Sequence, residues 1–370
     1  MVTGLCLSDP HPDYVSDGSA TRTLSATRFA GRYRVADFTL SNMVNSGIFD
    51  VRMILNSNYQ SLIDHIGTGK EWDLARKSGG VTYFPPYLLD ERQSVNSEID
   101  GPLYRAALAL STLRTQHIVL ADSGIVYNMD YRRAIETHKK SGADVTAVFT
   151  KKIVSTESTK NTVIFRISDE NRVTTIRAAR TSTSQQDVSL GAYVMEKSVF
   201  LQLISGEKNC GMLRFSKEIL GSALRRLNVV GYEYTGYSAQ ICSLDTFFRH
   251  NMEMLEPEKR NALFEVDNRR IYTSRRDTLP TKYGRDADIK NSIIADGCQI
   301  EGTVINSVLC RSVRVGAGAV VKNCIIQGGI IEKDAQLEWI VADRGVFVSE
   351  GRRLISTDTY PIYVGRERIV

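Results

Sequence analysis

The stretch IIADGCQIEGTVINSVLCRSVRVGAGAVVKNCIIQGGIIEKDAQL (Ile293–Leu337) decides the architecture of the C-terminal part of the chain. An apolar residue recurs there at intervals of six, and glycine and other small residues fill the gaps. A six-residue period is typical of a left-handed parallel β-helix, in which three hexads make one turn and the apolar residue points inward. We therefore predict stacked coils whose inward positions run from Ile294 to Ile300, from Leu309 to Val315 and Val321, and from Ile325 to Ile331 and Leu337.

Upstream of this region, segments with strand and helix periodicity alternate. We predict strands at Val2–Leu7, Val51–Leu55, His117–Ala121 and Asp144–Phe149, and helices at Val35–Ser46, Leu103–Leu113 and Met129–Gly142. Such alternation is typical of a doubly wound, mostly parallel α/β sheet, and the strands from about residue 162 to 194 would extend it as a mixed sheet. We expect an α/β domain at residues 1–258, a linker at 259–285 and a left-handed β-helix at 286–370.

Composition and charge argue against several classes of protein. The 370 residues carry a net charge of +5, whereas nucleic-acid-binding domains usually concentrate a larger basic excess. No stretch approaches the roughly 18 apolar residues of a membrane-spanning helix, and no Cys/His spacing matches a zinc site. We expect a cytoplasmic protein with reduced thiols that uses neither nucleic acid nor a membrane as a partner.

A basic segment lies near the N-terminus. TRTLSATRFAGRYR (Thr21–Arg34) carries four arginines and no acid, and it precedes the predicted helix. Arginine binds phosphate through two parallel hydrogen bonds, which makes phosphate a natural ligand for this segment. No glycine-rich loop precedes it, however, because Gly18 is the only glycine between Leu5 and Leu24. The segment could therefore serve phosphate chemistry or only bind phosphates.

The chain resembles the ADP-glucose pyrophosphorylases, also called glucose-1-phosphate adenylyltransferases, over essentially its whole length. The resemblance is carried by FAGRYRVADFTLSNMVNSGI (Phe29–Ile48), YNMDYRRAIETHKKSGADVT (Tyr127–Thr146), LGAYVM (Leu190–Met195), RFSKEIL (Arg214–Leu220) and SLDTFFRHNMEML (Ser243–Leu255). It implies a nucleotidyltransferase-like α/β domain followed by a hexapeptide β-helix, and a place in glycogen synthesis. Enzymes of this family join glucose 1-phosphate to ATP with the help of Mg²⁺, and they release pyrophosphate.

Several residues that this chemistry requires are replaced. Leu24 and Ser25 stand at the family's Lys-Pro pair, and a leucine cannot offset phosphate charge. The two metal carboxylates of the family correspond to Gly124 and Gln240, and a neutral amide is a poor ligand for a hard dication. The family's sugar-phosphate motif has no counterpart in TIRAARTSTS (Thr175–Ser184).

Only remnants of the nucleotide-sugar pocket persist. Tyr104 and Arg105 match the family's nucleotide segment, although alanines replace the Gly-Thr pair that follows, and Ser189 matches a residue of the sugar pocket. The resemblance therefore implies a regulatory subunit with little or no activity and no cofactor of its own, Mg²⁺ being needed by a catalytic partner subunit. We expect a hetero-tetramer with that paralogue, or a homo-oligomer when the chain is alone.

Three arginines fall where the family gathers basic residues for its effectors. Arg22, Arg28 and Arg34 would lie between the N-terminal lobe and the β-helix and bind a sugar phosphate or a related anion. An equally weighted alternative is that they pair with acids elsewhere in the chain or at a subunit interface. The C-terminal segment could add further basic residues to this junction, namely Arg352, Arg353, Arg366 or Arg368.

Two other functions are open at this point. The chain could be an active adenylyltransferase that uses displaced metal ligands such as Asp122, two positions from Gly124. It could also be a sugar-phosphate acyltransferase of the β-helix type. That reaction usually needs a histidine base on a coil, and no histidine follows His250. Turnover by the purified chain would separate the first of these from a regulatory subunit.

Overall fold

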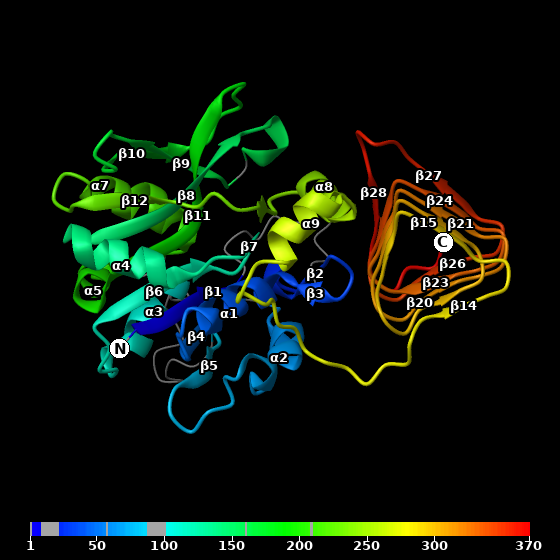
Figure 1. Cartoon of the computed structure of the whole chain (residues 1–370), viewed down its shortest axis with the longest axis horizontal. Coiled ribbons are helices and arrows are strands. Elements are labelled where there is room, and N and C mark those ends of the chain that lie inside the picture. The colour runs from blue at the N-terminus through cyan, green and yellow to red at the C-terminus, as the bar shows by residue number, and fades with distance from the viewer. Residues whose placement is uncertain (1, 9–21, 57, 87–100, 160, 208–209) are drawn as a thin grey trace, which may run out of the picture.

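A computed structural model describes residues 2–8, 22–56, 58–86, 101–159, 161–207 and 210–370. In this part of the chain an α/β domain and a β-helix lie side by side (Figure 1). None of the helices described is long and apolar enough to cross a membrane.

A nine-stranded sheet forms the centre of the N-terminal domain. Its order is β10-β9-β11-β6-β1-β4-β5, and β8 pairs with both β11 and β12. The central strands β6, β1, β4 and β5 are parallel, whereas β11 runs antiparallel to β6 and β8. This arrangement confirms the predicted parallel sheet and its mixed extension. The strands are β1 (Val2–Leu7), β4 (Asp50–Ile54), β5 (Gly80–Phe84), β6 (His117–Asp122), β8 (Val145–Ile153), β9 (Val163–Ile167), β10 (Val173–Ala178), β11 (Gln185–Glu196) and β12 (Val229–Glu233).

Helices cover both faces of this sheet, as expected for a doubly wound domain. Side chains alternate along β1, so that Leu5 and Leu7 belong to one buried cluster and Cys6 to another. The cluster of Leu5 includes residues of α3 (Pro102–Ser111), α5 (Lys197–Ile204) and the continuous helical segment α6 (Met212–Arg214), η4 (Phe215–Leu220) and α7 (Gly221–Ala223). The cluster of Cys6 includes residues of α1 (Val35–Asn45), α2 (Gln60–Ile66) and α4 (Tyr131–Ser141).

Helix α1 is anchored at its N-terminus by a buried carboxylate. The Asp37 side chain accepts a hydrogen bond from the Arg34 backbone N–H at 2.9 Å, which satisfies one of the donors left free at a helix start. Its other oxygen lies 2.6 Å from Nε2 of His65 on α2. These contacts fix Arg34, the residue that caps α1, at the edge of the domain.

The chain crosses between the domains along α1. After α8 (Leu244–Met252), η5 (Glu253–Leu255) and α9 (Pro257–Phe264), residues 265–281 contain no helix or strand. Ser41 Oγ accepts a hydrogen bond from the Tyr272 N–H at 2.9 Å, and Asn45 donates one to the Arg270 carbonyl at 2.9 Å. The predicted linker at 259–285 therefore includes most of α9, and the first strand of the β-helix already begins at Lys282, because strand pairing with the next coil starts there.

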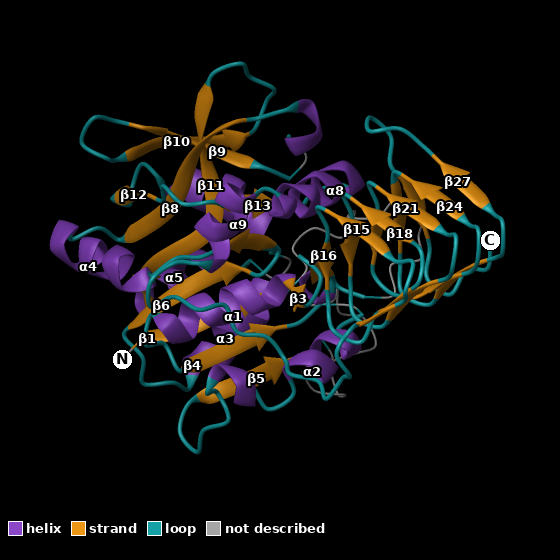
Figure 2. Cartoon of the chain, turned by 45° about the vertical axis from the view of Figure 1, so that its right-hand side comes forward, coloured by secondary structure: helices purple, strands orange, loops and turns teal. Residues whose placement is uncertain are grey.

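The C-terminal domain consists of five coils whose short strands stack into three parallel sheets (Figure 2). One sheet contains β14 (Lys282–Tyr283), β17 (Gln299–Ile300), β20 (Val313–Val315), β23 (Gly329–Ile331) and β26 (Val346–Val348). The second contains β15 (Asp288–Lys290), β18 (Thr303–Ile305), β21 (Val320–Lys322), β24 (Gln336–Glu338) and β27 (Arg353–Ile355). The third contains β16 (Ile293–Ile294), β19 (Val308–Leu309), β22 (Ile325–Ile326), β25 (Ile340–Ala342) and β28 (Ile362–Val364). The left-handed β-helix predicted from the hexads is confirmed.

The middle strands of the third sheet, β19, β22 and β25, are buried on both faces, and this corrects one predicted position. Ile326 points into the β-helix, whereas Ile325 belongs to a cluster shared with the N-terminal domain, together with Val308 and Val341. Because both residues of each strand pair are apolar here, periodicity could not tell which one faces inward. The same cluster contains Phe38 of α1, so it joins the two domains.

Candidate functional site

An apolar side chain, Leu24, stands at the position that the resemblance assigns to the family's active-site lysine. Leu24 lies in η1 (Leu24–Ala26), is 1% exposed and packs in the cluster that also contains Phe29 and Phe247. The next residue, Ser25, lies with its Oγ 2.9 Å from Oγ of Ser123, at the end of β6. This corner of the domain is therefore a packed interior and offers no positive charge to a phosphate.

The two positions that the resemblance assigns to the metal, Gly124 and Gln240, do not fit Mg²⁺. Gln240 lies in β13 (Ser238–Gln240), which pairs antiparallel with β7 (Ile125–Tyr127), so that Gln240 stands opposite Ile125. Gly124, the other position, immediately precedes β7. Neither side chain supplies a carboxylate, and Mg²⁺ sites usually rely on one or two of these. Among the described residues, no three His, Cys, Asp or Glu side chains come together as a metal site.

Asp122, the candidate for a displaced ligand, holds the turn between β6 and β7. Its carboxylate accepts a hydrogen bond from the Gly124 N–H at 2.7 Å, and the residue is 2% exposed. Gly191 lies so close that a Cβ there would be 2.7 Å from Cβ of Asp122. The carboxylate thus has a structural role in this turn, where it is buried beside β11.

The remnants of the sugar and nucleotide pocket are mostly internal. Ser189 is 5% exposed, and its Oγ accepts a hydrogen bond from the Gly191 N–H at 3.2 Å and lies 3.2 Å from the Tyr193 hydroxyl. Burial raises the pKa of Tyr193, which keeps that hydroxyl neutral. Tyr104 is half-buried on α3, a different element from β11, which carries Ser189. Gly18, the only glycine where the family has its glycine-rich loop, lies outside the described residues.

The three predicted arginines converge at the junction of the domains. Arg22 forms an ion pair with Asp343 of the β-helix. Arg28, at the start of β2 (Arg28–Phe29), donates to the Gln327 carbonyl and lies 3.4 Å from that of Arg311.

Arg34 lies at the end of β3 (Tyr33–Arg34), directly opposite Arg28 in the β2–β3 pair. Its guanidinium donates to the Ser61 carbonyl at 2.5 Å and to Ser61 Oγ at 3.0 Å. Of these three arginines, only Arg22 is in an ion pair that joins the two domains, so the acid-pairing alternative is satisfied for Arg22.

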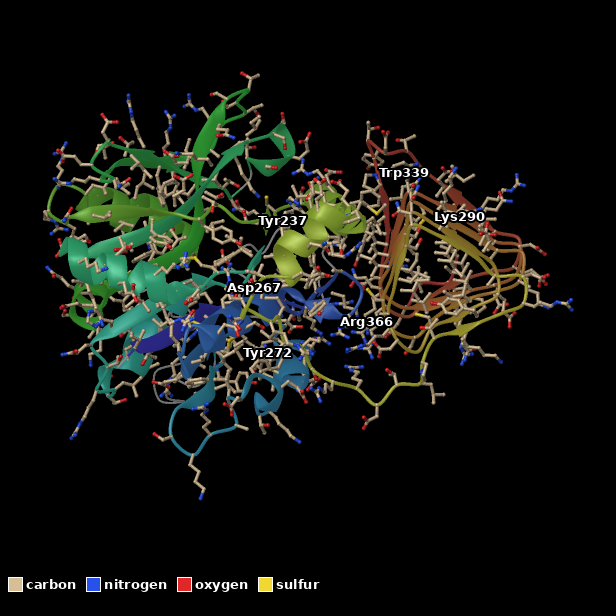
Figure 3. The ribbon with its side chains drawn as sticks, viewed as in Figure 1. Tyr237, Asp267, Tyr272, Lys290, Trp339 and Arg366 are labelled. Atoms are coloured by element: carbon tan, nitrogen blue, oxygen red, sulfur yellow. The ribbon has the colours of Figure 1, made fainter. Side chains whose placement is uncertain are left out.

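Three further arginines, Arg276, Arg344 and Arg366, lie near these three. We call the six residues together the arginine cluster. A Cβ on Gly328 would lie 3.7 Å from Nη1 of Arg28 and 3.6 Å from Cγ of Arg344, so the two side chains flank this glycine. Figure 3 shows Arg366 at the same junction, where the β2–β3 pair meets the β-helix. Of the C-terminal arginines considered from sequence, all four are exposed, and Arg366 forms an ion pair with the neighbouring Glu367 at 2.9 Å.

The field within the cluster is positive. Burial lowers the pKa of Arg34 to about 9. The Asp37 carboxylate opposes this shift, and the charges of Arg28, Arg276 and Arg22 add to it.

The β-helix side of the cluster behaves in the same way. The pKa of Arg344 is also lowered, by burial and then by Arg28, Arg276, Arg366 and Arg22. Because like charges are held together at this cost, an anion bound among them would be stabilised.

A buried acceptor also lies at this junction. Gln327 is 3% exposed, and its Oε1 has no hydrogen-bond partner among the described residues. Arg276 and Arg344 could not be assigned from sequence, because they stand far from Arg22 along the chain and lack a motif. The crossing segment brings Arg276 to this place, and the stacking of coils brings Arg344, next to Gly328, toward β2.

Comparison with known proteins identifies both parts of the chain. Residues 19–248 match the nucleotidyl transferase family model, and residues 278–359 match the GlmU-like C-terminal hexapeptide model. The chain is 34% identical over 350 residues to the glycogen biosynthesis protein GlgD of Bacillus subtilis (strain 168), covering 94% of this chain and 91% of that protein. A GlgD of Geobacillus stearothermophilus is 36% identical, with 81% and 77% covered. A glucose-1-phosphate adenylyltransferase of Thermosipho africanus (strain TCF52B) is 31% identical, with 80% and 72% covered.

Proposed function

Since this chain belongs to the nucleotidyl transferase family, with the GlgD proteins and glucose-1-phosphate adenylyltransferases among its relatives, we propose that it is a regulatory subunit in glycogen biosynthesis. It would have little or no activity of its own and would modulate a paralogous subunit that makes ADP-glucose from ATP and glucose 1-phosphate. It would act in the cytoplasm.

The burial of Leu24 is the observation that carries this proposal. A side chain that is 1% exposed in an aromatic cluster stands where the resemblance requires a lysine beside the triphosphate. Phosphoryl transfer depends almost entirely on positioned positive charge from side chains and metal ions. Neutral residues at positions 124 and 240 remove the carboxylates that would hold the metal. The changes act together, because each one weakens the same charge stabilisation.

The arginine cluster supports an effector role for the domain junction. We propose that a sugar phosphate or related anion binds between β2–β3 and the Gly328 corner, with Arg28, Arg34 and Arg344 as its main contacts. Such an anion would be held by groups from both domains, so its binding would change how firmly they are joined. That change would be the signal passed to a partner subunit.

Partner binding follows from the same proposal. We propose a hetero-tetramer with the catalytic paralogue, or a homo-oligomer when the chain is alone, with Mg²⁺ required by the catalytic subunit and no cofactor bound by this one. Large apolar side chains are exposed on the last coil, where Ile355 is 58%, Tyr360 73% and Ile362 41% exposed. Exposed apolar residues grouped in this way support a contact with another subunit.

Pyrophosphate release tests the proposal. ATP, glucose 1-phosphate and Mg²⁺ are supplied to this chain alone, to the catalytic paralogue alone and to the two co-expressed. We expect no turnover by this chain and an altered rate for the mixture. Metal-dependent turnover by this chain that is lost in Asp122→Asn would overturn the proposal in favour of an active adenylyltransferase with a displaced ligand.

Anion binding to the cluster is tested separately by calorimetry with fructose 1,6-bisphosphate and inorganic phosphate. Arg28→Gln and Arg344→Gln each remove a charge-assisted hydrogen bond, so we expect each to weaken binding about tenfold. Arg353→Gln, an exposed arginine on β27, is the matched control and should bind as the unaltered chain does. Equal binding by all three variants would show that the cluster is not the site.

A further inference from the structure

A hollow lies between the two domains, on the side of α8. Its volume is about 690 Å³, and it is an open hollow bordered by α8, η5 and the turn that precedes β28. We call it the α8 groove. It is lined by Glu157, Asp245, Phe248, Arg249, Met252, Glu253, Glu256, Lys259, Trp339, Asp358, Thr359 and Pro361. None of these residues belongs to the arginine cluster or to the remnant of the nucleotide pocket.

Trp339 occupies a corner where the three preceding coils have asparagine. The residues after β15, β18 and β21 are Asn291, Asn306 and Asn323, with φ of 43°, 47° and 51°. The residue after β24 is Trp339, with φ of 58°. Asparagine tolerates this left-handed conformation, whereas a bulky side chain adopts it at a cost. The fold therefore accepts strain to place an indole at this corner, a pattern that is common at functional positions.

The indole forms part of an apolar floor in the groove. Its ring centroid lies 5.7 Å from that of Phe248 on α8, with the planes tilted by 45°. Met252 and the buried Pro361 also line this floor. Figure 3 shows Trp339 on the side of the β-helix that faces α8. Trp339 is only half-buried by these contacts, so part of its ring remains available to a ligand.

The rim of the groove is acidic. Five of the lining residues are carboxylates, and two, Arg249 and Lys259, are cations. Lys259 is paired with Glu253 and Glu256. Asp245 and Asp358 are exposed and form no ion pair with another described residue. The groove therefore carries a net negative charge beside an aromatic surface.

We propose that the α8 groove binds an organic cation of the alkylammonium type, such as a polyamine. Trp339 would attract an ammonium group through its ring face, which is the strongest aromatic partner for cations. Asp245 and Asp358 would neutralise further ammonium groups of the same chain, and Phe248, Met252 and Pro361 would contact the methylene segments. The volume falls in the range of small-molecule pockets, and the negative rim disfavours phosphates and nucleotides.

Tryptophan fluorescence provides a direct readout, because the chain has only two tryptophans. Trp72 is 1% exposed and is replaced by phenylalanine, so that the signal comes from Trp339 alone. Spermidine is titrated at low ionic strength, with NaCl of equal ionic strength and maltotriose as separate titrations. We expect a saturable change with spermidine only. A change of the same size with NaCl, or saturation by maltotriose and not by spermidine, would overturn the proposal.

Trp339→Asn is the decisive variant, because it restores the residue of the preceding coils. If Trp339 serves a ligand, this change should keep or raise the thermal midpoint and weaken spermidine binding, measured by calorimetry, about tenfold or more. If Trp339 serves only to pack against Phe248, the thermal midpoint should fall and the affinity for spermidine should be unchanged. That result would refute the proposal.

Asp245→Asn and Asp358→Asn test the charges without touching the core. Each should weaken spermidine binding roughly threefold, as is usual for exposed ion pairs. Glu350→Gln, an exposed carboxylate after β26, should have no effect. Equal effects of all three variants would indicate general charge screening and would count against a site in the groove.

Discussion

Neutralising Asp343 should loosen the joint between the domains. This residue is 5% exposed, forms the ion pair with Arg22, and accepts hydrogen bonds from the Tyr363 hydroxyl and the Arg344 N–H, both at 2.6 Å. Asp343→Asn would leave Arg22 as an uncompensated charge in a cluster that is already positive. Removing one partner of a buried pair costs about 3–5 kcal/mol, and we take about 3 because Arg22 is partly exposed.

The thermal midpoint measures this loss. At about 2–4 °C for each kcal/mol, the midpoint of Asp343→Asn should fall by roughly 6–12 °C in a buffer without multivalent anions. Phosphate should restore more stability to this variant than to the unaltered chain, because the cluster has gained one net positive charge and binds the anion more tightly.

Glu350→Gln serves as the control, because it removes an exposed carboxylate of the same domain. A fall of less than about 2 °C for Asp343→Asn would show that the ion pair contributes as little as an ordinary surface pair. A phosphate increment no larger than that of the unaltered chain would refute the view that Asp343 balances an anion site.

Three further outcomes are expected. Gly329→Ala should disrupt the β-helix, because the φ of Gly329 is 138° and the new Cβ would lie 2.1 Å from the Val346 carbonyl oxygen. Thermal unfolding followed by circular dichroism measures the loss of stability. Gly211→Ala is the control, because a Cβ at that position would have no atom within 4 Å. Glu253 is partly buried, which would raise its pKa, but hydrogen bonds from His250 and the Tyr237 hydroxyl outweigh burial and lower it to about 2. The resulting stability is present above pH 4.5 and is lost as the pH falls toward 2, so urea unfolding of Glu253→Gln should depend less on pH across this window than that of the unaltered chain. All six cysteines are buried, and burial raises the thiol pKa of those at positions 6, 210, 298, 310 and 324. A thiol reagent at pH 7.5 should therefore react slowly with the native chain until denaturant is added. Rapid reaction of the native chain would contradict this expectation.

Much of the fold could be predicted because its signals are local. Strand β1 was predicted with its observed bounds, since a short apolar run before a turn needs no distant information. The β-helix was recognisable because each coil repeats the same spacing and adjacent coils bury the same kind of residue. The sequence could not predict that Ile325 faces outward from the β-helix, because the residues that bury it there, such as Phe38, belong to the N-terminal domain.

In the candidate site, too, the residue types could be read from the sequence, whereas their packing could not. The losses at Leu24, Gly124 and Gln240 concern residue type, and a leucine or glycine cannot become a charged ligand in any fold. Only the tertiary structure shows that Leu24 is buried in a cluster with aromatic side chains. It also shows that the Asp122 carboxylate accepts a hydrogen bond from the Gly124 N–H.

By itself, the sequence determined the two architectures, their order along the chain and the residue types at the positions that the resemblance assigns to catalysis, because periodicity and residue type are properties of short segments. Only the tertiary structure decided what stands at the junction. Arg276 and Arg344 reach Arg28 through the crossing segment and the stacking of coils, and Trp339 meets Phe248 across the domain boundary. The physical reason is that charge repulsion and aromatic packing depend on distances of a few ångströms between residues far apart in the chain, and the fold alone sets those distances.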